Sequence, residues 1–438
     1  MYRFWDSARF MNTTASKGIG SFFGNLGPGL LLAATAIGAS HLVMSPQAGS
    51  LFGFQLLWLV TLTHLFKYHA FEFGPRYAAA TGESLIAGYM RVPGPKGWTL
   101  WILQAGTVAQ GIGVLAGVVS IAAAVLFTFV GRMSPEFYTA LVIATILGFL
   151  FLGGYGWLDF LNKIMMTVLF LATAVVFIPA VPPPAVLKNF VVPLKPPGSI
   201  PLIAAILGWM PTGIDVSIWH SLWTLEKHPE LTSKGAQGAR KLAILRLSLV
   251  DMRIGYALSF VVAAVFLILA ALFLQGTDLQ IKDIGFAESL AAIYTKQIGS
   301  WMYVVFMVAA FSAMYSTTYT VIDGFSRSFA ETAATLRPNL RAKWWKRLYW
   351  GFVLATALFA YVVVVKVGNP VRLVKVVAIL SLCVAPLYYG LNYYCVTRFI
   401  KQEEFRPKMP ARVVAVLGIV VMFLATLLYA GSRLKLIK

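Results

Sequence analysis

The sequence predicts an all-α membrane protein in which two sets of five transmembrane helices form an inverted repeat and an eleventh helix follows. Of the 438 residues, 59 % are hydrophobic and only 12 % are charged, whereas soluble proteins contain roughly 45–50 % apolar and about 25 % charged residues. The apolar residues form long runs, and two of these runs, one in each half, are interrupted by Gly, Pro or Ser. Composition and pattern both argue against a pair of soluble domains.

The number of helices follows from the length of the apolar runs, because a helix needs about 20 residues to cross roughly 30 Å of hydrocarbon. Eleven runs qualify, and the boundary between the fourth and the fifth is the least distinct. They cover residues 27–46, 51–71, 99–130, 137–156, 158–181, 201–223, 248–275, 300–325, 347–367, 373–397 and 411–431. The only sizeable polar segments are two basic loops, 224–247 and 326–346, so we expect one transmembrane domain over residues 1–438.

The interrupted runs are the first and the sixth, so they recur five helices apart. Because each half then holds an odd number of helices, the two halves would cross the membrane in opposite directions. We therefore expect a first repeat over residues 1–181, a second over 201–397, and an additional helix over 411–431. Sequence similarity between the halves is weak.

The basic residues lie mainly in short segments between the apolar runs, although the net charge is +20. This distribution indicates topology signals and attraction to anionic lipid rather than nucleic-acid binding. Most Lys and Arg fall on one side if the N-terminus is cytoplasmic, and the positive-inside rule then puts the C-terminus outside. We expect a multi-pass, monomeric protein of the cell membrane whose partners are lipid and a small solute.

The two interruptions carry the strongest functional signal. The first contains Gly38-Ala39-Ser40-His41, and the second extends from Trp209 to Asp215. Backbone groups freed within a membrane are tolerated only where they line a cavity. A matched pair of broken helices, one in each half, indicates the substrate site of a membrane transporter.

Several short motifs in the first eight helices resemble the Nramp family of divalent-metal transporters. They are Gly27-Pro28-Gly29, Gln47-Ala48-Gly49-Ser50, Leu56-Leu57-Trp58, Ala80-Thr81-Gly82, His220-Ser221 and Ile322-Asp323-Gly324-Phe325. The resemblance implies the LeuT fold, with helices 1 and 6 broken, and secondary transport of cations by alternating access. We find no phosphate loop, metalloprotease motif or nucleophile elbow, so we expect neither an enzyme nor a cofactor.

The chain departs from the family at the residues that bind metal. Family members carry Asp-Pro-Gly-Asn in the first helix, and these positions here are residues 38–41, reading Gly-Ala-Ser-His. The Met-Pro-His motif of the sixth helix, registered on His220, falls on Gly213, Ile214 and Asp215, with a one-residue shift left open. The third helix, where the family has acidic residues for proton movement, has no carboxylate over residues 104–113. The sequence therefore predicts a divergent member with a rebuilt site.

Asp215 and His41 are the candidate residues with titratable side chains. A charge at mid-membrane costs a few kcal/mol even on lenient scales, so Asp215 should have a functional partner. Alternatively, it lies nearer the cytoplasm and pairs with a loop Lys. His41 can exchange a proton near neutral pH, or it is a neutral side chain bound to a freed carbonyl. Lys67 and Glu72 are expected near the inner interface, where Lys67 would snorkel.

The remaining candidates are small, polar or aromatic. Gly38 and Gly213 should leave a wider cavity, because glycine replaces a metal ligand at each position. Ser40 and Thr212 either contact the substrate or satisfy unwound backbone. Trp209 and Tyr315, with Trp219 nearby, could present aromatic faces to a cation, or serve as packing and interface anchors.

These residues leave three hypotheses. The favoured one is a secondary transporter of a small cationic solute, specifically an organic cation, with no metal site. The alternative is a divalent-metal transporter for Mg²⁺ or Mn²⁺, which would use His41, Asp215, backbone carbonyls and retained waters. The third is a sensor that keeps the fold without transport, although the sequence offers no soluble output domain.

Overall fold

The computed structural model describes residues 36–152, 167, 170–180, 182–232, 238–279 and 281–434. Every regular element in these residues is helical, which confirms the predicted fold class. The predicted first run, 27–46, and fifth run, 158–181, lie partly outside the described residues.

Eight helical segments in the described part of the chain are long and apolar enough to cross a membrane. The first of them covers Ser40–Thr81 and contains η2 (Ser40–Met44), α3 (Ser45–Phe52), η3 (Gly53–Leu56) and α4 (Leu57–Thr81). The other long helices are α6 (Trp98–Val130), α7 (Pro135–Leu152), α11 (Gly238–Phe273), α13 (Met302–Leu336), α14 (Asn339–Val367), α15 (Pro370–Arg398) and α16 (Met409–Arg433).

Shorter elements connect the long helices or lie between them. They are α5 (Leu85–Met90), η4 (Pro184–Phe190), α9 (Ile200–Trp209), α10 (Val216–Lys227), η5 (Pro229–Leu231), α12 (Phe286–Gln297) and η6 (Glu403–Phe405). The predicted loops 224–247 and 326–346 are wrong in part, because α11 already begins at Gly238 and α13 continues to Leu336. Polar residues such as Arg, Lys, Glu and Gln favour the helix as strongly as many apolar ones, so helices can extend beyond the apolar runs.

Both predicted interruptions are present. In the first, the backbone turns at Ile37 and Gly38 and continues through the π-helix η2, a form of helix that often occurs at functional sites. In the second, α9 ends at Trp209 and α10 begins at Val216. Pro211 lacks an amide hydrogen and disfavours a helical conformation at Met210, which is extended, with φ −96° and ψ 127°.

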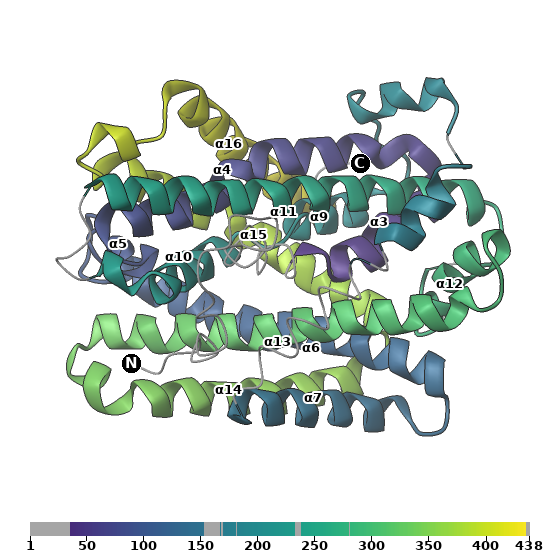
Figure 1. Ribbon diagram of the computed structural model, residues 1–438, viewed down its shortest axis with the longest axis horizontal. Coiled ribbons are helices and arrows are strands. Elements are labelled where there is room, and N and C mark those ends of the chain that lie inside the picture. The colour runs from purple at the N-terminus through teal and green to yellow at the C-terminus, as the bar shows by residue number, and fades with distance from the viewer. Residues whose placement is uncertain are drawn as a thin grey trace, which may run out of the picture.

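The broken segments lie between two layers of long helices. Figure 1 shows α4 and α11 along one side, α13, α14 and α7 along the other, and α3, α9 and α10 between them. Two glycines bring the broken helix close to its neighbours. A Cβ added to Gly74 of α4 would lie 2.2 Å from the carbonyl oxygen of Ser217, and one added to Gly208 would lie 1.9 Å from that of Ala378. Such close backbone approach is typical of membrane helix interfaces.

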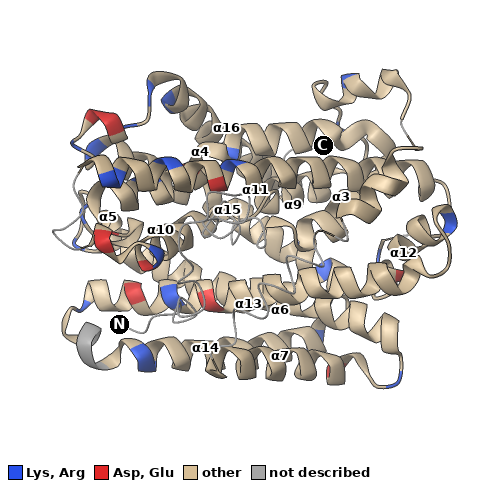
Figure 2. Cartoon of the chain, viewed as in Figure 1, with Lys and Arg blue, Asp and Glu red and all other residues tan. Residues whose placement is uncertain are grey.

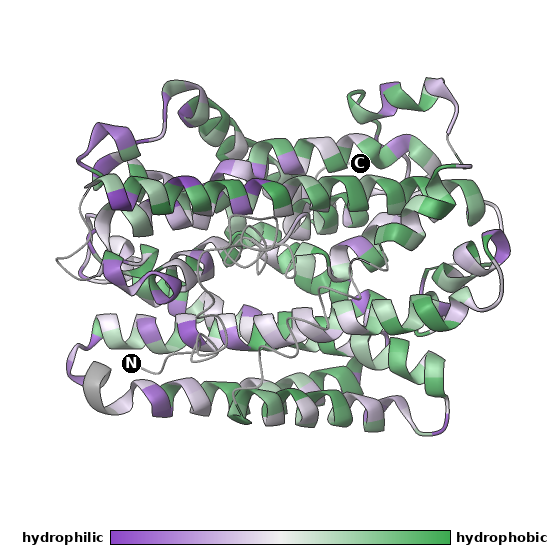
Figure 3. Ribbon diagram, viewed as in Figure 1, coloured by the Kyte–Doolittle hydropathy of each residue, from purple (hydrophilic) through white to green (hydrophobic). Residues whose placement is uncertain are grey.

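The outer surface fits a lipid environment. Large apolar side chains are exposed along α14 and α16, for example Leu358 and Phe423, and hydrophobic residues dominate the long helices in Figure 3. Charged residues gather around α5 and α10 at one end of the molecule (Figure 2), which we call the charged end. These features describe a multi-pass membrane protein.

Candidate substrate site between the broken helices

A small cavity lies where the two interruptions meet. Its volume is about 30 Å³, and five of the eight predicted site residues line it: Ser40, Trp209, Thr212, Gly213 and Asp215. One water molecule needs about 10–15 Å³ of such space. The cavity therefore has room for water or a small ion, and an organic solute would need the helices to separate.

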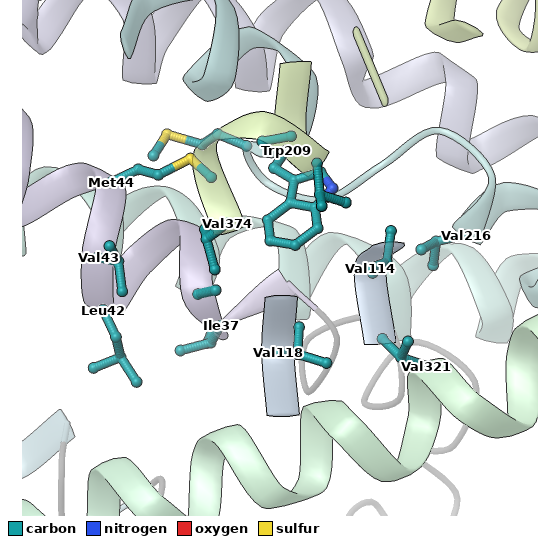
Figure 4. Packing of buried hydrophobic residues seen from close by; sticks show 14 of the residues in the cluster. Ile37, Leu42, Val43, Met44, Val114, Val118, Trp209, Val216, Val321 and Val374 are labelled. Carbon is teal, nitrogen blue, oxygen red and sulfur yellow. The ribbon is translucent and has the colours of Figure 1, made fainter. Parts of the chain in front are cut away.

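Four further lining residues come from intact helices. They are Val114 and Val118 of α6 and Thr317 and Val321 of α13, and the three valines lie on the same side of Trp209 in Figure 4. Each pair is spaced four residues apart and therefore lies on one helix face. That spacing was a usable signal for the valines. Thr317 belongs to the polar stretch 315–319, in which sequence alone did not distinguish the residue that faces the cavity.

The prediction that Gly38 and Gly213 widen the cavity is wrong. A Cβ at Gly38 would lie 2.9 Å from Oγ1 of Thr317, and a Cβ at Gly213 would lie 2.3 Å from Oδ1 of Asp215. The side chains of Thr317 and Asp215 thus occupy the space that each glycine leaves. Gly38 permits this close contact without lining the cavity itself.

Asp215 borders the cavity at the end of the second interruption, directly before α10. Its side chain is buried, with 6 % of the residue exposed. The helix amino terminus carries a partial positive charge, which favours a carboxylate at this position. Among the described residues, Lys67 of α4 acts electrostatically on this carboxylate.

Lys67 contradicts the prediction that it snorkels to the interface. Its side chain is fully buried, because α4 packs against both α9 and α10 and position 67 faces the interruption between them. Its ammonium group, which has three N–H donors, lies within hydrogen-bonding distance of four carbonyl oxygens of that segment. The Nζ–O distances are 3.2 Å to Leu207, 3.0 Å to Gly208, 3.0 Å to Met210 and 2.7 Å to Thr212.

His41 is fully buried but is not among the residues that line the cavity. Its Nδ1 lies 2.8 Å from the hydroxyl of Ser40, and its Nε2 lies 3.0 Å from the carbonyl oxygen and 2.9 Å from the hydroxyl of Ser259 in α11. The Ser259 hydroxyl also lies 3.1 Å from Nε2 of His64. A hydrogen-bonded chain therefore runs from Ser40, at the cavity, through His41 and Ser259 to His64.

The aromatic candidates differ in position. The Trp209 indole N–H donates to the hydroxyl of Ser381 at 3.0 Å while its ring borders the cavity. Trp219 also lines the cavity and packs edge-on against Phe325, with ring centroids 4.6 Å apart. Tyr315 lies away from the cavity, between Phe149 and Phe311. Its residue type was a poor guide because aromatic side chains also pack against one another in protein cores.

The described residues contain no group of three or more His, Cys, Asp or Glu side chains that could hold a metal ion. Of the two ligands in the metal alternative, Asp215 borders the cavity, whereas His41 bonds to α11. Met210, which precedes Pro211 at the break, is buried but does not line the cavity either.

An ionic network ties α10 to α13 and α14 at the charged end. Arg327 of α13 pairs with Asp323 at 2.7 Å and with Glu226 of α10 at 2.5 Å. The hydroxyl of Tyr349 in α14 donates to Asp323 at 2.7 Å. A second contact joins Arg76 of α4 to Glu72 and to the carbonyl oxygen of Phe405, so Glu72 is engaged locally rather than at the cavity.

Arg253 of α11 donates to the hydroxyl of Tyr68 in α4 at 3.0 Å. This bond links α11 to α4.

The chain is similar in sequence and in fold to proteins that are already known. An uncharacterized protein of Pasteurella multocida (strain Pm70) is 29 % identical over 434 residues, covering 94 % of this chain and 93 % of its own. The manganese transporter of Eremococcus coleocola, in complex with an aromatic bis-isothiourea substituted compound, has a similar fold. Its TM-score is 0.72 at 14 % identity, over 96 % of this chain and 90 % of that one.

The fold extends to more distant transporters. MhsT in complex with L-phenylalanine has a TM-score of 0.58 at 14 % identity, over 91 % of this chain and 98 % of that one. These likenesses confirm the LeuT-like fold. A family model described as natural resistance-associated macrophage protein-like matches residues 29–430. This transporter chain therefore belongs to the Nramp family.

Proposed function

We propose that this member of the family moves a small organic cation across the membrane by alternating access, with Asp215 as the counter-charge. The observation that carries the proposal is the buried carboxylate of Asp215 at the edge of a small cavity between two broken helices. A carboxylate at membrane depth is costly unless a cation compensates it. Lys67 supplies part of that compensation, but its ammonium is already shared among four carbonyl groups.

The ligand set favours a singly charged solute over a divalent metal. Besides Asp215, the polar side chains at the cavity are the hydroxyls of Ser40, Thr212 and Thr317. Divalent ions require several hard oxygen or imidazole ligands.

The cavity walls add an attraction specific to organic cations. The rings of Trp209 and Trp219 both border the cavity, and an aromatic face stabilises a desolvated cation by about 2 kcal/mol. A solute larger than water requires α9 and α10 to move away from α6 and α13. The ionic network of Glu226, Asp323 and Arg327 would then open on the charged side during the cycle.

Thermal-shift titration of the purified protein tests this proposal. The ligands are small primary amines, guanidinium compounds, Mg²⁺, Mn²⁺ and Cd²⁺. We expect saturable stabilisation by at least one organic cation and no stabilisation by micromolar metal. The effect should be lost in Asp215→Asn and kept in Asp278→Asn, a control that removes an exposed carboxylate. Micromolar Mn²⁺ binding that disappears in Asp215→Asn would contradict the proposal and favour a rebuilt metal site.

A further inference from the structure

Lys67 reaches a set of carbonyl groups that the broken helix leaves without helical partners. Leu207 and Gly208 belong to the last turn of α9, and Met210 and Thr212 lie in the interruption. The last four carbonyls of a helix have no intrahelical donor, and the helix carboxyl terminus carries a partial negative charge. The four oxygens thus form an electronegative cage, which the ammonium group of Lys67 fills.

The geometry of this cage is that of an ion-binding shell. Its four oxygens lie 2.7–3.2 Å from Nζ, and they come from backbone groups alone. Rings of backbone carbonyls bind monovalent cations by replacing their hydration shell, and unwound carbonyls with half-helix carboxyl ends are a general site for a coupling cation in transporters. An ammonium group and a potassium ion are similar in size. The cage is therefore chemically suited to a monovalent cation.

The charge in the cage is attached to the protein. Lys67 is fully buried on α4, and it forms no ion pair within 4 Å in the described structure, although the Asp215 carboxylate attracts it. Because the ammonium group is bonded to the Lys67 side chain, it cannot leave the site and enter the solution on either side of the membrane. It also links α4 to the break, because the carbonyl groups belong to α9 and the segment that follows it.

We propose that Lys67 takes the place of a free monovalent cation, so that the protein has a filled cation site and needs neither Na⁺ nor K⁺ there. The inference concerns the ion requirement and does not depend on which solute Asp215 binds. It makes Lys67 a specificity-determining residue, because removing the ammonium group would create a site for a free monovalent ion.

The test uses Lys67→Met and Lys67→Gln in the full-length protein. The variants, the wild type and the control Lys366→Met, which changes an exposed lysine at the end of α14, are purified in KCl, NaCl or N-methylglucamine chloride at equal ionic strength. Melting temperature is then titrated against K⁺ and Na⁺. We expect a saturable rise of several degrees in the Lys67 variants alone, with recovery of folded protein better in KCl or NaCl than in N-methylglucamine chloride.

Three results would overturn the inference. One is that both Lys67 variants fold and neither responds to K⁺ or Na⁺. Another is that neither variant can be recovered in any of the salts, since the cage then cannot hold a free ion. The last is a saturable stabilisation of the wild type by K⁺ or Na⁺, which would reveal a free-ion site that Lys67 does not fill. Loss of organic-cation binding, by contrast, bears only on the proposed function.

Discussion

The contact between Gly38 and Thr317 allows a quantitative test of how the site has been rebuilt. In Gly38→Ala the added Cβ would lie 2.9 Å from Oγ1 and 3.0 Å from Cγ2 of Thr317. Real Cβ contacts are rarely this short, and Thr317 cannot easily rotate, because it is β-branched and its hydroxyl donates to the carbonyl oxygen of Ala313 at 2.9 Å. The backbone at Gly38 does not have a positive φ, so the expected strain is purely steric.

Overpacking of this kind costs about 1–3 kcal/mol, so Gly38→Ala should lower the melting temperature of a chain of this length by about 1–3 °C. Thr317→Ala should relieve the clash, because the nearest remaining atom, Cβ of residue 317, lies 3.4 Å away. Thr317→Ala alone should cost about 1 kcal/mol for the lost methyl group. The double variant should therefore be more stable than the two single changes predict by addition, by about 1 kcal/mol or more.

The assay is thermal and denaturant unfolding of detergent-solubilised protein, with all four proteins measured under identical conditions. If the two single changes in the free energy of unfolding add up to that of the double variant within about 0.5 kcal/mol, the two sites are independent and the proposed contact is refuted. A Gly38→Ala variant as stable as the wild type would refute it as well.

Three further predictions concern charge and hydrogen bonding. Arg327→Ala should destabilise the protein by about 3–5 kcal/mol, because it removes the cation that pairs with the buried carboxylate of Asp323 and the half-buried carboxylate of Glu226. Arg240→Ala, which breaks an exposed pair, should cost at most about 1 kcal/mol, and equal melting temperatures of the two variants would contradict this prediction. Ser259→Ala should lower the free energy of unfolding by about 1–3 kcal/mol, because the hydroxyl that joins His41 to His64 is lost. An unchanged denaturation midpoint would argue against this hydrogen-bonded chain of side chains. Uptake of the cationic solute into proteoliposomes should increase with membrane potential, which supplies about 2.3 kcal/mol per charge per 100 mV. Accumulation of the solute driven by a proton gradient alone would contradict this prediction.

The sequence predicted the fold because that information is local. Long apolar runs define membrane helices, and Met210-Pro211 marks the second break through the restrictions that proline imposes. The division into repeats over 1–181 and 201–397, the cytoplasmic N-terminus and the monomeric state stay predictions. The helix predicted over 158–181 falls largely among residues that the structure does not describe.

The site was harder to predict because its geometry is not local. The partners of Lys67 are carbonyl groups about 140 residues away, and carbonyl groups leave no trace in residue type. The π-helix that begins at Ser40 changes the angular spacing of side chains, so sequence position could not tell that Ser40 faces the cavity and His41 faces α11. The Asp215 side chain fills the space beside Gly213 only because the backbone between them is unwound, which the sequence alone does not specify.

Uptake by proteoliposomes containing Asp215→Asn tests the central claim most directly. Two opposite unit charges 4 Å apart attract each other by about 4 kcal/mol at an effective dielectric constant near 20. Losing only a third of that energy weakens binding about tenfold. Organic-cation uptake should therefore fall at least tenfold in Asp215→Asn, while folding is retained and Asp278→Asn matches the wild type. Wild-type uptake by Asp215→Asn would contradict the account and leave Asp215 with a structural role only.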